Sequence, residues 1–297
     1  MRQEAYFCTV KELDELGKNN IPRQLISHTH LIYSSPATLA FNSPGAEGFG
    51  VKRAGLAVPD SVMLIVSPGC CGRNTSVLSS MRAYQDRFYY LLMDETDIVT
   101  GRHLKKIPKA VAEICEGLKK KPSVVMICIT CVDALLGTDM ERVCHKAEEY
   151  AGVPVRPCYM YALTREGRKP PMVHVRQSVY SLLEPKKKKG NVVNLLGYFS
   201  PLTDDCELYD LLHGAGVKTI HEISRCKDYA QYQTMSEANF NLVLHPEARF
   251  AAEDFHDRLK IPYIELRRLY QIDKIASQYR ALAAALGVEF EDEIPRD

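Results

Sequence analysis

Short apolar runs alternate with amphipathic segments along most of the chain. Residues 62–67 (VMLIVS) are continuously apolar until the final serine, as expected of a strand that is buried on both faces. Residues 103–120 instead place Ile107, Val111 and Ile114 at helical spacing. Strand and helix patterns in this alternation are typical of α/β proteins with parallel sheets.

The alternation is interrupted once and then restarts. Residues 185–191 (PKKKKGN) predict a solvated linker, with an anion site built by the four lysines as the alternative. After this segment, further strand patterns follow at residues 192–199, 217–223, 241–245 and 262–266. We therefore predict an α/β fold of two Rossmann-like, doubly wound parallel-sheet domains, residues 1–187 and residues 188–297.

Capping residues and loop-forming residues predict where some of these elements begin and end. Asp139 is placed to cap the N-terminus of a helix, and Gly152 is placed to end the same helix. Residues 35–50 (SPATLAFNSPGAEGFG) are rich in glycine, proline and serine, so they predict a loop rather than regular structure.

Composition excludes two broad classes of partner. The chain of 297 residues carries 38 Lys and Arg against 37 Asp and Glu, without the basic excess that a nucleic-acid footprint requires. Its apolar runs are far shorter than the roughly 20 residues that span a bilayer. Its first residues also lack the apolar stretch of a signal peptide. We therefore expect a cytoplasmic protein that binds neither nucleic acid nor membrane.

Ten cysteines raise the question of metal chemistry. In a reducing compartment, thiols are core residues, nucleophiles or metal ligands. Cys115 and Cys144 fall on helix patterns, Cys158 lies beside a strand and Cys128 lies within one. We interpret these four as core residues.

Three other cysteines stand where strand patterns end. Cys70 and Cys71 follow residues 62–67, and Cys131 follows residues 123–130. Parallel strands end at the same edge of their sheet, so the three thiols are predicted to lie along one edge. Thiolates beside glycines suit an iron–sulfur cluster, because small neighbours allow the cluster to approach the backbone.

Two other kinds of thiol site fit this segment less well. A thioredoxin-like CxxC motif places its cysteines at the start of a helix, whereas Cys128 in "CITC" lies within a strand pattern. A structural zinc site needs a second closely spaced pair of ligands, and the chain holds one CxxC spacing.

The segments around these thiols resemble the nitrogenase component 1 superfamily. "SPGCCGRNTS" is similar to that family's Pro-x-Gly-Cys-Gly segment, and "MDETDIVTGRHLKKIPKAVAEI" resembles its acidic Asp-Ile-Val-Phe-Gly-Gly stretch and following helix. "TCVDALLGTDMERVCHKAEEYAGVPVRP" resembles its Thr-Cys-Pro segment. "ANFNLVLH" and "LKIPYIELRRLYQIDKIASQYRALA" resemble two segments of its second domain. The resemblance covers roughly residues 40–287.

The resemblance implies a cluster site and two kinds of partner. It assigns cluster ligation to Cys71 and Cys131, and the expected cofactor is an iron–sulfur cluster of the 4Fe–4S type at a subunit interface. The partners it implies are a second component-1-like subunit, identical or paralogous, and an ATP-hydrolysing component 2 iron protein. The chain has no G-x₄-G-K-[ST] phosphate loop, so ATP hydrolysis is expected of that partner.

The chain departs from the family pattern at two ligand positions. The family has a third cysteine some 25 positions before the equivalent of Cys71, and no cysteine stands in that region here. Cys70, Glu47 or thiols of a second subunit are the alternatives for completing the site. His245 stands where the catalytic subunit of nitrogenase anchors its cofactor through cysteine. It is a candidate cofactor-binding residue, or alternatively a hydrogen-bonded structural histidine.

Three functions remain open. The first is an oxidoreductase: a component-1-like subunit of an ATP-dependent two-component reductase that passes electrons through the cluster to a substrate. Its interdomain cleft would include Arg225, Cys226, His245 and Arg249, which are otherwise surface charges and core residues. The second is a scaffold that carries a metal cluster or cofactor during assembly, without turnover. The third is a small-molecule binder that has lost the cluster. The second domain is the last one expected, so dinitrogen reduction on a nitrogenase-type cofactor is not expected.

Overall fold

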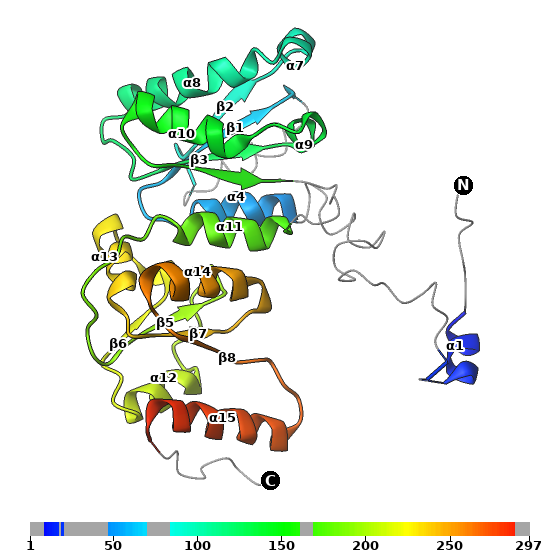
Figure 1. The fold of residues 1–297 in the computed structure, drawn as a ribbon, viewed down its shortest axis with the longest axis vertical. Helices are drawn as coiled ribbons and strands as arrows, with labels where there is room; N and C mark the ends of the chain where they lie inside the picture. Colours follow the sequence, from blue (N-terminus) through cyan, green and yellow to red (C-terminus); the bar gives the residue numbers. More distant parts are fainter. Residues whose placement is uncertain (1–8, 18, 21–46, 70–83, 161–168, 289–297) are drawn as a thin grey trace.

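The fold consists of two units, each built on a four-stranded parallel sheet, stacked along the long axis of the molecule (Figure 1). The structure is a computed structural model, and it describes residues 9–17, 19–20, 47–69, 84–160 and 169–288. The predicted α/β fold with two parallel sheets is confirmed. The domain boundary at residues 187/188 stays a prediction.

The two sheets have the same topology. The first has the strand order β2-β1-β3-β4 and the second the order β6-β5-β7-β8. The strands are β1 (Val62–Ser67), β2 (Phe88–Leu92), β3 (Val125–Ile129), β4 (Val155–Tyr159), β5 (Val192–Leu196), β6 (Thr219–His221), β7 (Phe240–Val243) and β8 (Tyr263–Glu265).

Each sheet therefore contains one point at which the winding direction reverses. From β1 the chain first adds β2 on one side and then β3 on the other, and it repeats this path from β5 to β6 and then to β7. In open parallel sheets, ligands bind beyond the carboxyl ends of the strands at this switch point. The two positions of functional interest are therefore the β1/β3 edge and the β5/β7 edge.

Helices cover both faces of both sheets (Figure 1). Helices α8 and α10 lie on the outer face of the first sheet, α4 and α11 lie between the sheets next to α14, and α12 and α15 lie on the outer face of the second sheet. The helices are α1 (Val10–Leu16), α4 (Glu47–Gly55), α7 (Glu95–Thr100), α8 (His103–Gly117), α9 (Cys131–Leu136), α10 (Met140–Ala151), α11 (Pro171–Tyr180), α12 (Glu207–Gly214), α13 (Tyr229–Gln233), α14 (Arg249–Leu259) and α15 (Ile272–Leu286).

Helix α10 forms where its local signals predict. The Asp139 side chain accepts a hydrogen bond from the backbone N–H of Arg142, which satisfies one of the free donors of the first turn. Gly152 ends the helix in the left-handed conformation, with φ of 60°. Both boundary predictions are confirmed.

A hydrophobic core joins the two units. Met63 and Ile65 of β1 point into the layer between the sheets, and the same buried cluster includes Leu196 of β5 and Phe255 of α14. The alternate β1 residues Val62, Leu64 and Val66 belong to a second cluster that lies under α8 and α10. Because successive side chains of a strand face opposite ways, a continuously apolar strand supplies both layers.

The loop prediction for residues 35–50 was wrong at its end. Residues 35–46 lie outside the described part of the chain, but Glu47 begins helix α4, whose Val51 and Ala54 are buried against the first sheet. Burial of these two side chains offsets the low helix propensity of the neighbouring glycines. Further along the chain, the short helix α13 is followed by a 3-10 helix, Thr234–Glu237.

The cysteines interpreted as core residues are confirmed in that role. Cys128, Cys144 and Cys158 are buried, and Cys115 packs partly buried against the cluster under α8. Burial raises the pKa of the Cys128 thiol to about 11 and raises the pKa of the other three. All four therefore stay protonated at neutral pH, which disfavours them as nucleophiles.

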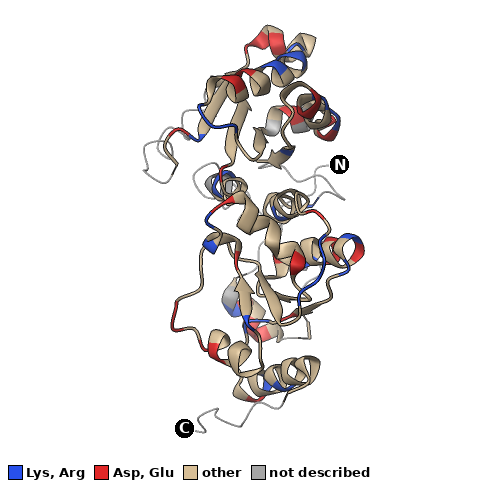
Figure 2. Cartoon of the chain, turned by 90° about the vertical axis from the view of Figure 1, so that its left-hand side faces the viewer, with Lys and Arg blue, Asp and Glu red and all other residues tan. Residues whose placement is uncertain are grey.

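Basic and acidic residues are distributed over both units. Figure 2 shows Lys and Arg interspersed with Asp and Glu along the described part of the chain. No helix among the described residues is long and apolar enough to cross a membrane.

The layer between the sheets carries a pH-sensitive histidine. His174 of α11 contacts the Tyr159 ring edge-on and the Ser178 hydroxyl at 3.3 Å, and burial lowers its pKa from 6.5 to about 4. The unfolded chain therefore binds this proton more readily, so the stability that neutral His174 contributes is complete above pH 6.5 and is lost as the pH falls toward 4.

Replacing this histidine should flatten the acid side of the stability curve. Between pH 7 and 4 we expect the wild type to lose about 2–3 kcal/mol of unfolding free energy relative to His174→Gln. Urea unfolding at several pH values measures this difference. Parallel curves for the two proteins would show that His174 is not responsible.

Candidate cluster-binding edge and second switch point

The first switch point brings together the backbone segments that follow β1 and β3. The two strands pair in parallel, with Val66 opposite Ile129, so their next residues, Ser67 and Thr130, leave the sheet side by side. Adjacent strands lie about 4.8 Å apart. The segments that carry the predicted ligands therefore start from neighbouring points on one edge.

Two buried hydroxyl groups mark this edge. Ser67 and Thr130 are at most 1% exposed, and neither hydroxyl oxygen has a hydrogen-bond partner among the described residues. Buried polar groups are usually paired, so orphaned hydroxyls at a strand end indicate a place where a polar partner belongs. Their position matches the edge at which a cluster with sulfide and thiolate acceptors is predicted.

The predicted ligands themselves are only partly placed. Cys70 and Cys71 lie outside the described residues. Cys131 is the first residue of α9 and Glu47 is the first residue of α4, and the side chains of both also lie outside the described part. The assignment of Cys70, Cys71, Cys131 and Glu47 to a metal site stays a prediction. The side chains that are described contain no group of three or more His, Cys, Asp or Glu residues that could hold a metal ion.

A buried polar contact supports the helix that begins at Cys131. Asp133 of α9 contacts Nε2 of His103 at 3.0 Å and accepts a hydrogen bond from the Thr138 hydroxyl at 3.0 Å. The other ring nitrogen of His103 lies 3.1 Å from the backbone oxygen of Asp97. The pair ties α9 to the first turn of α8. Sequence reasoning missed it, because the two residues are 30 positions apart and neither belongs to a recognisable motif.

The second switch point is built around a glycine and a histidine. Gly197 follows β5 with φ of +136°, and a Cβ atom there would lie 2.7 Å from the backbone nitrogen of His245 and 2.8 Å from its Cβ. The His245 ring stands edge-on to Tyr198, and its side chain is 36% exposed. Only glycine allows the segments after β5 and β7 to approach this closely.

An arginine from between the sheets holds this edge in place. Arg176 of α11 donates to the Gly197 carbonyl from Nε at 3.0 Å and from Nη2 at 2.6 Å. Its Nη1 donates to Glu247 Oε2 at 2.8 Å, and the guanidinium lies 4.9 Å from the centre of the Phe199 ring. Arg176 is 4% exposed, so these are buried, charge-assisted contacts.

The protonation state of His245 suits a ligand role. Burial lowers its pKa, with Glu247 acting in the opposite direction and Arg176 in the same direction, so the ring is neutral at pH 7. Nδ1 accepts a weak hydrogen bond from the Glu247 N–H at 3.3 Å, and Glu247 Oε2 lies 3.6 Å from the same atom. Because Nδ1 accepts, the proton of the neutral ring lies on Nε2. A metal-binding histidine usually donates its second N–H to a carboxylate or carbonyl, so metal binding through Nε2 requires the tautomer with the proton on Nδ1, facing Glu247.

The close approach at Gly197 gives a stability prediction. Gly197→Ala should lower the free energy of unfolding by about 2–4 kcal/mol, because the new methyl group meets backbone atoms and the residue must keep a positive φ. Chemical denaturation measures the change. Gly117→Ala at the end of α8 is the control, since no atom lies within 4 Å of a Cβ placed there. An equal effect of the two substitutions would contradict the packing shown here.

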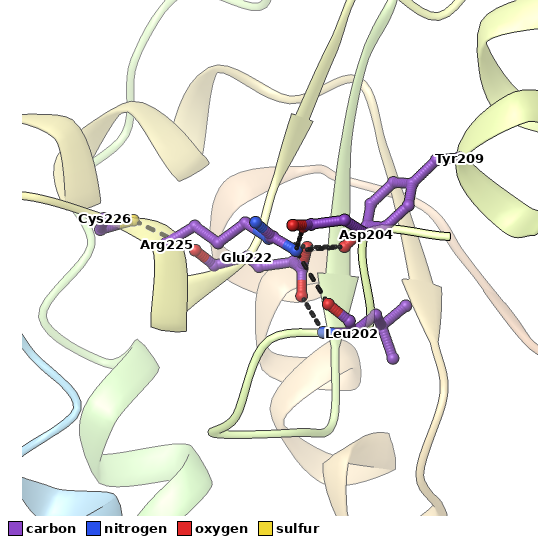
Figure 3. A network of polar contacts seen from close by, with 6 residues as sticks. All are labelled: Leu202, Asp204, Tyr209, Glu222, Arg225 and Cys226. Carbon is purple, nitrogen blue, oxygen red and sulfur yellow. Dashed lines mark hydrogen bonds and ion pairs between the residues drawn. The ribbon is translucent and has the colours of Figure 1, made fainter. Parts of the chain in front are cut away.

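The remaining cleft candidates have structural partners (Figure 3). Arg225 donates to Asp204 Oδ1 at 2.6 Å and to Glu222 Oε1 at 2.9 Å, and Glu222 accepts from the backbone of Leu202. The Cys226 thiol donates to the Glu222 carbonyl, and burial raises its pKa to about 11. Arg249 pairs with Glu265 at 2.7 Å. These contacts account for Arg225, Cys226 and Arg249 without a ligand.

Comparison with known proteins relates the chain to one family. The family model described as "Nitrogenase component 1 type Oxidoreductase" matches residues 47–297. A protein of Nostoc sp. (strain PCC 7120 / SAG 25.82 / UTEX 2576), named nitrogenase iron-molybdenum cofactor biosynthesis protein NifE, is 27% identical over 77% of the chain and 49% of its own length. The protein of the same name from Klebsiella pneumoniae is 27% identical over 82% of the chain and 58% of its own length. The chain thus spans about half the length of these relatives.

Solved structures show the same fold. The structure named "Nitrogenase Cp1 at pH 6.5" superposes with a TM-score of 0.61 at 18% identity, covering 82% of this chain and 58% of the other. "Nitrogenase Cp1 at pH 5" superposes with a TM-score of 0.56 at 21% identity, covering 80% and 51%.

Proposed function

Because the chain belongs to the nitrogenase component 1 type oxidoreductase family, we propose that it is a scaffold subunit that holds a metal–sulfur cluster or cofactor during assembly, without turnover. One observation carries this proposal. The relatives in Nostoc, Klebsiella pneumoniae and Rhizobium meliloti (strain 1021), at 26–27% identity over 77–82% of the chain, are all named as cofactor biosynthesis proteins.

The first switch point is the proposed cluster site. Cys71 and Cys131 would supply thiolates, and Cys70, Glu47 or a second subunit would complete the ligand set. The adjacent ends of β1 and β3 and the orphaned hydroxyls of Ser67 and Thr130 support this assignment. When bound, a 4Fe–4S cluster would supply one-electron chemistry and sulfide bridges.

The second switch point is the proposed cofactor site. His245 would bind a metal through Nε2 once the ring proton has moved to Nδ1, which lies 3.6 Å from the Glu247 carboxylate. Arg176 fixes Glu247 and the Gly197 carbonyl, so it would keep the ring from turning away. Imidazole is a neutral ligand, unlike the thiolate of the catalytic nitrogenase subunit. It would therefore hold a metal cofactor less tightly, as transfer to another protein requires.

The partners belong to the same proposal. A second component-1-like subunit would share the cluster at an interface, and an ATP-hydrolysing component 2 iron protein would supply electrons from outside the chain. A reductase acting on a substrate of its own is the second candidate, favoured by the family description as an oxidoreductase.

One experiment separates the scaffold from the reductase. The anaerobically isolated, metal-loaded protein would be mixed with an apo-protein acceptor, with and without a reduced component 2 protein and ATP. A scaffold should transfer iron and sulfide to the acceptor, and it should not consume ATP continuously. Steady ATP consumption with retained metal would instead establish the reductase.

A further inference from the structure

A pocket of about 610 Å³ lies in the first unit, between the turn from α7 to α8 and the segment from α9 to α10. Its lining includes none of the residues assigned to the two switch points, but it shares helix α9 with the first. Figure 1 shows α7 and α9 at the same end of this unit. The volume falls within the range of small-molecule sites, about 300–1,000 Å³.

The pocket wall is largely apolar. It is lined by Ile98 and Val99 of α7, Leu104 of α8, Leu136 of α9 and Val143 of α10. Val99 is 85% exposed and Leu136 is 51% exposed. Two large apolar side chains that face solvent beside a pocket offer a surface for the apolar part of a ligand.

The charges of the pocket are mainly basic. Lys105 of α8 and Arg142 and Lys146 of α10 line it, and none of the three forms an ion pair with a described residue. Arg142 and Lys146 are four positions apart on one helix, so they project from the same face. The lining includes one carboxylate, Asp139, whose Oδ1 caps α10.

Neighbouring cations outside the pocket lining form ion pairs. Arg102 and Lys106, on the same stretch of chain as Lys105, both contact the buried Asp97, at 3.4 and 2.6 Å. His103, which also lines the pocket, has both ring nitrogens engaged, by the backbone oxygen of Asp97 and by Asp133. Arg102, Lys106 and His103 therefore have polar partners, whereas the three cations that line the pocket pair with no described carboxylate.

We propose that this pocket binds a small organic anion, with its carboxylate or phosphate group on Arg142 and Lys146 and its apolar part against Ile98, Leu104 and Val143. Arginine matches the planar oxygens of carboxylate and phosphate through paired N–H donors. Inorganic phosphate alone would leave the apolar wall uncovered and most of the volume empty. None of the lining residues is assigned to a metal site, so the proposal can be tested on the chain without a cluster.

The test is calorimetric titration of the full chain with three probes that share a phenyl ring. Phenyl phosphate and benzylsuccinate carry the two candidate anionic groups, and benzyl alcohol is the neutral comparison. We expect at least one anion to bind with a dissociation constant in the millimolar range or tighter, and benzyl alcohol to bind much more weakly. The anion with the lower dissociation constant identifies the charged group that the site prefers.

Variants test the location. Arg142→Ala and Lys146→Ala should each weaken binding about tenfold, since each removes a charged hydrogen-bond donor. Arg142→Ala keeps the backbone N–H that Asp139 caps, so helix α10 should stay intact. Lys109→Ala is the matched control, an exposed lysine of α8 outside the pocket lining.

Three results would overturn the proposal. They are binding of neither anion, equal binding of benzyl alcohol, and an equal loss of affinity in Lys109→Ala and Arg142→Ala. The last result would show general charge attraction rather than a site.

Discussion

Cys131→Ala should abolish the iron content of the anaerobically isolated protein while leaving its fold largely intact. The residue begins α9 at the end of β3, where it would supply a thiolate that no methyl group can replace. The helix itself is held further along, by the contacts of Asp133 with His103 and Thr138. Iron and sulfide analysis, together with circular dichroism, measures both parts of the prediction.

Cys115→Ala is the matched control for this experiment. Cys115 packs partly buried on α8, and its protonated thiol is unsuited to metal binding. We expect it to retain full iron content and to lose about 1–3 kcal/mol of unfolding free energy. Unchanged iron in Cys131→Ala would remove this residue from the site.

Arg176→Ala should destabilise the protein by about 3–5 kcal/mol, the typical cost of removing one partner from a buried charged network. The substitution leaves the Gly197 carbonyl without its two guanidinium donors and Glu247 without its 2.8 Å ion pair. It also removes the guanidinium from the face of Phe199. Urea unfolding of the full chain measures the loss.

An exposed ion pair is the comparison for Arg176. Lys120, whose side chain is 76% exposed, contacts Asp60 at 2.8 Å, and Lys120→Ala should cost less than about 1 kcal/mol. If Arg176→Ala costs no more than Lys120→Ala, the arginine does not hold the second switch point together.

Short-range sequence patterns predicted most of the secondary structure. Strands such as β1 and β3 are buried on both faces, so they are continuously apolar apart from Ser67 at the end of β1, and the pattern was visible without a structure. The end of α10 was equally visible, because capping by Asp139 and Gly152 is local. Helix α4 was missed, because its formation depends on burial of Val51 and Ala54 against a distant sheet.

Sheet topology allowed the sequence to predict where the candidate site lies, but not which side-chain contacts build it. Parallel strands share an edge, so convergence of the segments after β1 and β3 followed from the sequence pattern alone. Arg176 contacts Gly197, 21 positions away, and Glu247, 71 positions away. Contacts between residues so far apart in the chain cannot be predicted from a local sequence pattern. The basic pocket was missed for the same reason, since Lys105 and Arg142 line the same pocket only because α8 and α10 pack together.

Crystallography of the anaerobically isolated protein, with data collected at the iron absorption edge, would locate the cluster. We expect an anomalous iron peak at the edge where β1 and β3 end, in contact with the sulfurs of Cys71 and Cys131. A structure with these two sulfurs in separate layers, or with its iron bound elsewhere, would contradict this expectation.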